Sequence, residues 1–290
     1  VTFGSWMGGD RDGNPNVTSE CTRDVVLLAR IQGVNLLFSA IQRLIFDLSM
    51  WRANDAVKAR AKEILAASES DKTAIFEERK RRNYDDFWKA IPEYEPYRVI
   101  LAELRDKLYN TRAVLRQCVA DSDLAIDVTD ASIVRHKEEL SEPLIACYES
   151  LIEVGDAQVA NAYLLDVIRK VQCFGMGLVK LDIRQESDRH AEAIDAVTRF
   201  VGLGSYLEWS EEKKIEWLTS ELENKRPLLP TDLECSAEVK EVLDTCKMIA
   251  RLQQTCPGSL GTYVISMATC ASDVLAVVLL QRECGCRRED

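Results

Sequence analysis

The sequence predicts a mostly α-helical protein that contains a few parallel β-strands. Long stretches repeat apolar residues every three or four positions, which is typical of amphipathic helices. Only three short segments, near 1–6, 178–183 and 262–268, have the alternating or β-branched character of strands. Each of them leads through a polar loop into a helical pattern, which is the order of parallel βα units.

The clearest helical pattern begins at Thr18 and continues to about Arg52. Thr18 can cap this helix, and Glu20 is favourable in its first turn. The apolar stripe of the helix consists of Val34, Leu37, Phe38, Ile41, Leu44, Ile45 and Leu48. Further helical patterns cover 55–67, 73–90, 96–119, 131–154 and 161–174. These helices are expected to form a scaffold between the strands.

The strand-loop-helix order recurs three times along the chain. The first strand leads through a glycine-rich loop into the helix from Thr18, and the second leads into a helix near 188–201. The third leads into a helix over 274–283, for which Ser272 is the expected N-cap. In a (β/α) barrel such polar loops meet at the C-terminal face, where the chemistry lies. Three strands cannot close a barrel of eight. If they belong to one barrel, the chain is a fragment of an eight-stranded TIM-type barrel embedded in many helices, and the other strands lie outside it.

Composition is that of a globular protein and limits the classes of partner. The chain has 290 residues, 47% hydrophobic and 29% charged, with a net charge of -11. An acidic chain repels phosphate backbones and anionic lipids, so nucleic acid and membrane surfaces are poor candidates for partners. The sequence has no run of 18 apolar residues and no secretory signal, so we expect no membrane span and a cytoplasmic protein. Both ends of the chain look cut, which suggests a piece of a longer protein.

Cysteine, histidine and charge patterns give no metal site. Ten cysteines are spread over the chain, and we expect free thiols in a reducing cytoplasm rather than zinc ligands or disulfides. His136 and His190 lie in charged, helix-like contexts and are expected at the surface. The charged run at 77–82 is expected to be a solvated face, and 224–230 a loop. Four thiols have apolar neighbours in the sequence and are expected to behave as small hydrophobes: Cys118, Cys147, Cys173 and Cys246.

The segment 8–15 is the most concentrated candidate for chemistry. Three glycines, an asparagine and a proline in eight residues bend the backbone tightly and permit a close approach. Asp10, Arg11 and Asp12 place a cation between two carboxylates on that bend. The residues alone leave open whether this is a functional loop or a turn with a structural ion pair. The spacing matches neither a P-loop nor a dinucleotide-binding loop.

The segment 182–187 is the second candidate. On a strand Asp182 and Arg184 point the same way, whereas Ile183 points into apolar packing. A guanidinium in this position suits a carboxylate or a phosphate, because it stays charged and binds both oxygens of such a group. A plain salt bridge between Asp182 and Arg184 is the alternative, and the residues alone do not decide between the two.

Several long motifs closely resemble the phosphoenolpyruvate carboxylase family. They are FGSWMGGDRDGNP at 3–15, LVKLDIRQES at 178–187, YVISMA at 263–268 and SDVLAV at 272–277. The resemblance runs along residues 1–290 in the same order, which would make the chain an internal part of one carboxylase domain. PYR at 96–98, RDKLYNTR at 105–112 and KRPLLP at 225–230 also resemble the family, the last two its plant-type members.

The resemblance implies a lyase that fixes carbon dioxide and supplies oxaloacetate to the tricarboxylic acid cycle. It would combine phosphoenolpyruvate with bicarbonate, with Mg²⁺ or Mn²⁺, and release oxaloacetate and phosphate. Arg184 matches an active-site arginine that contacts the anionic substrate, and Trp6 matches part of an apolar pocket for carbon dioxide. Asp10, Arg11 and Asp12 would shape the adjoining loop.

The resemblance also implies allosteric control and a homotetramer. Arg98 aligns with an arginine of the sugar-phosphate activator site in plant-type enzymes. The catalytic histidine and the metal ligands of the family would lie outside this chain, so the chain alone is expected to be inactive. Two alternatives stay open: another phosphoenolpyruvate-using barrel, such as pyruvate phosphate dikinase, and a non-catalytic helical interaction module.

Overall fold

The computed structural model describes residues 3–69, 93–230 and 233–286, and the predicted helix at 73–90 and the charged run at 77–82 lie outside these residues. The chain divides into two compact units, which are described separately. The helical unit comprises Val1–Thr2, Arg30–Gln117 and Thr129–Leu178. The strand unit comprises Phe3–Ala29, Cys118–Val128 and Val179–Asp290.

Helix α1, Ser19–Asp47, contributes its first part to the strand unit and the remainder to the helical unit. Thr18 caps it as predicted, because its Oγ1 accepts a hydrogen bond from the backbone N–H of Cys21 at 3.2 Å. The helix ends before the predicted Arg52. The next helix begins after Asn54, whose Oδ1 accepts a hydrogen bond from the N–H of Val57 at 3.0 Å.

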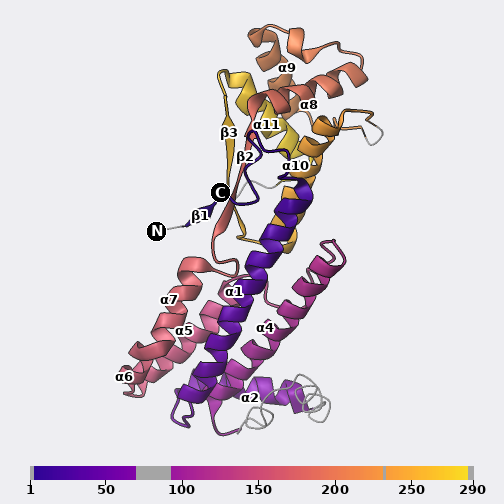
Figure 1. The fold of residues 1–290 in the computed structure, drawn as a ribbon. Coiled ribbons are helices and arrows are strands. Elements are labelled where there is room, and N and C mark those ends of the chain that lie inside the picture. The colour runs from indigo at the N-terminus through magenta and orange to yellow at the C-terminus, as the bar shows by residue number, and fades with distance from the viewer. Residues whose placement is uncertain (1–2, 70–92, 231–232, 287–290) are drawn as a thin grey trace. The chain divides into compact units, whose positions relative to one another are not determined.

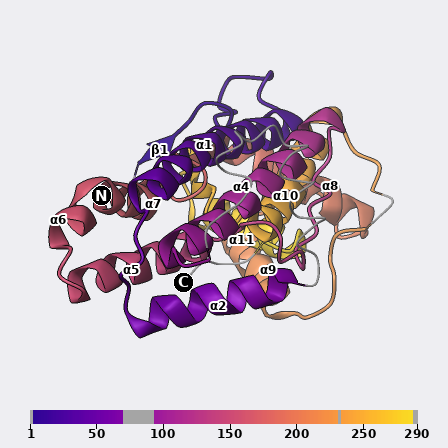
Figure 2. The same cartoon turned by 90° about the horizontal axis from the view of Figure 1, so that it is seen from below.

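The helical unit is a set of helices that pack along their apolar stripes. It contains α2 (Asp55–Glu69), α4 (Pro96–Ala120), α5 (Glu138–Glu153), α6 (Ala157–Val159), the π-helical segment Ala160–Leu164, and α7 (Leu165–Phe174). Helix α5 lies beside α7 and beside α2 (Figure 2). The Tyr97 hydroxyl, fully buried, lies 2.8 Å from Ser150 Oγ and joins α4 to α5. The predicted helices at 55–67 and 96–119 are therefore confirmed.

Two predicted helices of this unit have different bounds. The pattern at 131–154 becomes helical only from Glu138, since the backbone just upstream is bound by a side chain of the first helical turn. Glu139 Oε1 accepts from the N–H groups of Arg135 and His136, at 3.1 and 2.8 Å. The pattern at 161–174 is interrupted at Ala162, whose dihedral angles are not helical.

The strand unit contains a three-stranded parallel sheet in the order β1-β2-β3. These strands are β1 (Gly4–Ser5), β2 (Lys180–Glu186) and β3 (Leu260–Ser266). Gly4 pairs with Lys180, and Arg184 pairs with Val264. The three predicted strands and their parallel direction are confirmed, with bounds shifted by two or three residues at most ends. Among the described residues the sheet is open at both edges, so the chain itself shows a parallel sheet and not a closed barrel.

Helices cover one face of this sheet (Figure 1). They are α8 (Ser187–Phe200), α10 (Ala237–Thr255) and α11 (Ala271–Glu283). Helix α9 (Glu211–Glu223) packs on α11, and a short 3-10 turn lies at Tyr206–Glu208. Leu181, Ile183 and Gln185 of β2 are buried, whereas Asp182 and Arg184 on the other face are partly exposed. The alternation predicted for β2 is therefore confirmed.

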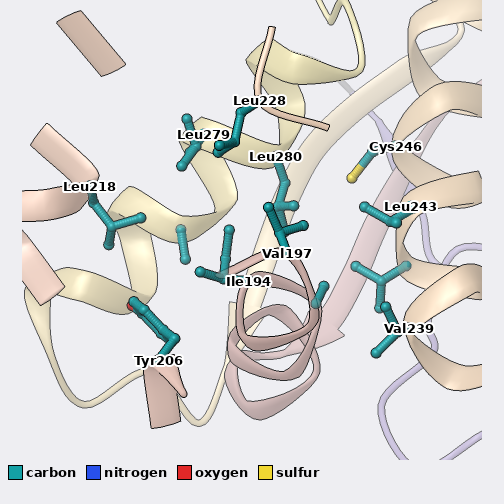
Figure 3. Packing of buried hydrophobic residues seen from close by; sticks show 13 residues of the cluster. Ile194, Val197, Tyr206, Leu218, Leu228, Val239, Leu243, Cys246, Leu279 and Leu280 are labelled. Carbon is teal, nitrogen blue, oxygen red and sulfur yellow. The ribbon is translucent and has the colours of Figure 1, made fainter. Parts of the chain in front are cut away.

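A hydrophobic core joins these helices, as Figure 3 shows. Ile194 and Val197 of α8 meet Leu279 and Leu280 of α11, with Leu243 of α10 close by. Burying side chains of this size contributes about 1.5–3 kcal/mol each. The segment 224–230 is a loop, as predicted, and contributes Leu228 to this core.

The predicted cap of α11 is wrong. Cys270 occupies the N-cap position, and the carboxylate of Asp273 accepts from the N–H groups of Thr269 and Cys270. Ser272 instead donates its hydroxyl to Glu211 at 2.7 Å, and this bond links α9 to α11.

Three further expectations need correction. His190 is fully buried, because the face of α8 that carries it packs on the sheet; His136 is exposed, as expected. Cys173 is exposed, whereas Cys118, Cys147 and Cys246 are buried as predicted.

Among the described residues α1 is long and apolar enough to cross a membrane, so the expectation of no such segment was too strong. Half of that apolar window is buried within the protein, which is also how a core helix behaves.

Candidate active-site cluster at the end of strand β2

The loop that follows β1 continues alongside the end of β2. The Arg184 N–H donates to Gly9 O at 2.9 Å, and the Arg11 N–H donates to Arg184 O at 2.9 Å. Asp10 and Arg184 therefore form an isolated parallel bridge. This pairing brings a loop near the N-terminus to a strand about 170 residues later.

Gly9 makes the close approach possible. A Cβ atom at this position would lie 2.0 Å from the backbone oxygen of Asp182, closer than atoms can approach. Since the obstacle is backbone, no side-chain rotation relieves it. The glycine-rich sequence is thus explained by contact with β2, as well as by turns at Gly8 and Gly13, where φ is +85° and +65°.

The guanidinium of Arg184 lies between the carboxylates of Asp10 and Asp12. Its Nη1 is 3.3 Å from Asp10 Oδ2, and its Nη2 contacts Asp12 Oδ2. These three side chains, Asp10, Asp12 and Arg184, form the Arg184 cluster. They are 24–30% exposed, so solvent reaches the cluster without hydrating it fully. An arginine has five N–H donors, and these two ion pairs leave others to bind an anion.

Trp6 stacks on this cluster. The Arg184 guanidinium carbon lies 5.4 Å from the centre of the indole, a cation–π contact. The indole is 53% exposed and presents an apolar surface beside the charge. The structure thus brings Trp6, Asp10, Asp12 and Arg184 together, as expected if they belong to one site.

These contacts show which partners the charged groups of the two candidate segments have. The Asp182–Arg184 salt bridge does not form, because Asp182 Oδ1 accepts from the Thr262 N–H at 2.8 Å while Arg184 turns to the loop. Arg11 is not the cation between Asp10 and Asp12; that cation is Arg184. Arg11 is 6% exposed, and its side chain is buried between the loop and the start of α1. Burial lowers the pKa of its guanidinium, whereas the charge of Glu241 raises this pKa.

Sequence analysis missed the contact between the buried His190 of α8 and the partly buried Tyr263 of β3. His190 Nε2 lies 2.7 Å from the Tyr263 hydroxyl. Burial lowers the pKa of His190 from 6.5 to about 4, against smaller opposite effects of the Glu186 backbone and Asp273. The apolar residues at 193, 194 and 197 on the same helix face could have indicated that position 190 is inward.

This pair predicts an acid-sensitive fold. The folded pKa of His190 lies below the unfolded value, so the unfolded chain takes up the proton first as the pH falls from 6.5 towards 4. We expect His190 to remove about 2 kcal/mol of the free energy of unfolding between pH 7 and pH 5. Urea unfolding at both pH values should show this loss in the wild type and in His136→Gln, and a smaller loss in His190→Gln. If the free energy of unfolding fell by the same amount between pH 7 and pH 5 in all three proteins, this assignment would be contradicted.

Arg98 belongs to the helical unit, whereas the Arg184 cluster belongs to the strand unit. It is 7% exposed, and its Nε donates to Ile45 O at 2.7 Å while Nη1 pairs with Glu95 at 2.7 Å. In this arrangement the guanidinium joins α4 to the end of α1.

The described residues do not fit a metal ion. Among them no group of three or more His, Cys, Asp or Glu side chains could hold one. The two carboxylates nearest to Arg184 are engaged by its guanidinium. In this structure both carboxylates are counter-ions to Arg184.

Comparison with known proteins decides the family. The family model described as phosphoenolpyruvate carboxylase matches residues 1–290. The chain belongs to the phosphoenolpyruvate carboxylase family. It is 52% identical over 288 residues to phosphoenolpyruvate carboxylase 1 of Chlamydomonas reinhardtii, covering 98% of this chain and 29% of that protein. It is 53% identical over 288 residues to the phosphoenolpyruvate carboxylase of Amaranthus hypochondriacus, covering 99% of this chain and 28% of that protein.

A third relative of this carboxylase family is phosphoenolpyruvate carboxylase 1 of Zea mays, at 52% identity over 290 residues, with 99% of this chain and 28% of the relative covered. The chain thus spans less than a third of the length of these relatives. The predicted family resemblance is confirmed, and the alternative of a different phosphoenolpyruvate-using family is not favoured.

Proposed function

We propose that this chain is part of an enzyme that carboxylates phosphoenolpyruvate with bicarbonate to give oxaloacetate and phosphate. The observation that carries the proposal is the Arg184 cluster at the carboxyl end of a parallel strand, in a chain that matches the carboxylase family from end to end. In this proposal β1, β2 and β3 are three strands of an eight-stranded (β/α) barrel. The uncovered face of the sheet, which carries Asp182 and Arg184, would then face the barrel interior.

Arg184 would bind an anionic oxygen of phosphoenolpyruvate or of the reacting phosphoryl group. Its position is set by Asp10 and Asp12, so little reorganisation is needed when substrate arrives. Trp6 would provide one apolar wall beside this charge, suited to holding carbon dioxide until the enolate captures it. An apolar wall also excludes water, which would otherwise protonate the enolate to pyruvate.

The charge of the cluster implies further cations. Asp10 and Asp12 outweigh Arg184, so the cluster alone carries a net negative charge and does not attract a trianionic substrate. The complete enzyme would supply a divalent cation, Mg²⁺ or Mn²⁺, which neutralises substrate oxygens when bound. The proposal places its ligands outside this chain.

Other properties of the complete protein are proposed from the family alone. They are a homotetramer, a cytoplasmic location, and allosteric activation by a sugar phosphate near Arg98. For the last of these, Arg98 would have to exchange Glu95 or the Ile45 carbonyl for a phosphate oxygen.

Bicarbonate dependence tests the proposed reaction. The complete parent protein should release phosphate from phosphoenolpyruvate only when bicarbonate is present, with an equal amount of oxaloacetate. Phosphate release without bicarbonate would instead favour a different phosphoenolpyruvate-using reaction, and no release at all would count against carboxylation.

Replacing Trp6 by alanine in the complete enzyme is expected to divert product from oxaloacetate to pyruvate. Loss of the indole opens the proposed pocket, so carbon dioxide escapes and water reaches the enolate. Coupled assays with malate and lactate dehydrogenases measure the two products. Trp6→Phe keeps an apolar ring and should stay close to the wild-type ratio; an unchanged ratio in Trp6→Ala would count against the pocket.

The 290-residue chain by itself is expected to form no oxaloacetate. The proposal assigns the general base and the metal ligands to parts of the parent protein outside this chain. A malate dehydrogenase-coupled assay with Mg²⁺, phosphoenolpyruvate and bicarbonate checks this. Turnover above background by the purified chain would refute that assignment.

A further inference from the structure

Glu241 is a carboxylate of α10 that lies under the loop following β1. Its Oε1 accepts a hydrogen bond from the Ser19 N–H at 2.5 Å and another from Thr245 Oγ1 at 3.1 Å. The same oxygen lies 3.9 Å from Arg11 Nε. One carboxylate oxygen thus contacts the start of α1 and the guanidinium beneath the loop, from a helix much later in the chain.

Arg11 is a buried cation that depends on this carboxylate. Its side chain is 3% exposed, and Glu241 is its ion-pair partner, itself 32% exposed. Arg11 Nε is buried and forms no hydrogen bond in the structure, so only the charge of Glu241 compensates that edge of the guanidinium. A buried guanidinium without a counter-charge is unfavourable, because it has lost its hydration.

The other edge of the same guanidinium holds the loop. Arg11 donates to Gly9 O at 3.2 Å, to Thr18 O at 3.2 Å and to Thr22 Oγ1 at 2.6 Å. Thr22 in turn donates its hydroxyl to Gly8 O at 2.7 Å. These bonds fasten the backbone of the loop to the first turns of α1.

The loop segment that Arg11 fastens also determines the position of Arg184. The backbone N–H of Arg11 donates to Arg184 O, and the neighbouring Asp10 and Asp12 bind the Arg184 guanidinium. An unbroken chain of contacts therefore runs from Glu241 through Arg11 to Arg184.

We propose that Glu241 is a positioning residue for the Arg184 cluster, acting through Arg11 and the loop it fastens. Glu241 does not touch the substrate. Without its charge, Arg11 moves towards solvent, the bonds to Gly9 and Thr22 weaken, and Asp10 and Asp12 no longer hold Arg184 in one place. The kinetic part of this inference rests on the proposed function; the structural part does not.

The kinetic test uses Glu241→Gln in the complete enzyme. We expect KM for phosphoenolpyruvate to rise and kcat/KM to fall by about tenfold to a hundredfold, since small misplacements of a binding group have effects of this size. A merely structural defect would lower the amount of active enzyme, and hence apparent kcat, and leave KM unchanged. Glu241→Asp keeps the charge and should recover part of the loss. Glu238→Gln, the same change at an exposed position of α10, should match the wild type.

A double-mutant cycle shows whether the effect passes through Arg11. In an Arg11→Gln background the further change Glu241→Gln should have little additional effect, because the cation it balances is gone. Additive losses would overturn the proposed route. If either variant fails to fold, Thr22→Val interrupts the same chain at a neutral link, and an unchanged KM in that variant would also overturn it.

Hydrogen exchange gives a readout that needs no catalysis. In Glu241→Gln the amides of residues 8–13 should exchange at least about tenfold faster than in the wild type, and those in Glu238→Gln should not. Unchanged exchange in Glu241→Gln would overturn the inference even if the enzyme is a carboxylase. Faster exchange in this variant of a protein shown to lack carboxylation would uphold the positioning role and reject the proposed function.

Discussion

Replacing Arg184 by glutamine in the complete enzyme is expected to lower kcat/KM for phosphoenolpyruvate by about a hundredfold to a thousandfold. Losses of this size follow the removal of one charged or preorganised donor from a reacting centre. The substitution also leaves Asp10 and Asp12 facing one another without the cation between them, so their repulsion would open the loop. Steady-state kinetics with phosphoenolpyruvate as the varied substrate measures the effect.

Arg189→Gln is the matched control for this variant. Arg189 lies five residues later on α8, is 42% exposed, and pairs with Glu192 at 3.1 Å on the helix surface. Surface pairs of this kind contribute little, so this variant should have wild-type kinetics. Wild-type kinetics in Arg184→Gln as well would remove Arg184 from the active site.

Replacing Gly9 by alanine is expected to separate the loop from β2. The added methyl group would meet the backbone of Asp182, so the loop must shift and both backbone bonds to Arg184 are lost. We expect a loss of about 3 kcal/mol in the free energy of unfolding, from two hydrogen bonds and the steric shift. Activity should fall by about a hundredfold, because Asp10 and Asp12 move with the loop.

Gly13→Ala measures the effect of an unfavourable backbone conformation alone, without the steric contact that Gly9→Ala introduces. Gly13 has a φ of +65° and open space where a Cβ would be, so alanine costs only the left-handed conformation, about 1–2 kcal/mol. Thermal unfolding and kinetics of the two variants should therefore rank Gly9→Ala as the more damaged protein in both measurements. An equal or greater loss in Gly13→Ala would mean that the contact with Asp182 is not what selects glycine at position 9.

Local patterns in the sequence were sufficient to predict the strands and most of the helices. The alternation around Ile183 and the β-branched run near Val264 depend on neighbours a few residues away, so they survive folding unchanged. The meeting of Trp6 with Arg184 was also predictable, because parallel strands bring their carboxyl ends to one edge of a sheet. The family motifs then predicted a role for both residues.

Long-range partners could not be predicted in the same way. Which cation Asp10 and Asp12 bind depends on Arg184, some 170 residues away, and the burial of Arg11 depends on Glu241, which is further still. His190 was misplaced because its immediate neighbours are charged, although its helix face packs on Tyr263. Ser272 has the chemistry of an N-cap, but Glu211 of α9 binds its hydroxyl.

A crystal structure of the complete enzyme with an unreactive phosphoenolpyruvate analogue tests the central assignment most directly. We expect a phosphate or carboxylate oxygen of the analogue within about 3 Å of an Arg184 nitrogen, with Trp6 beside it. An analogue bound elsewhere, with Arg184 still closed on both Asp10 and Asp12, would contradict it.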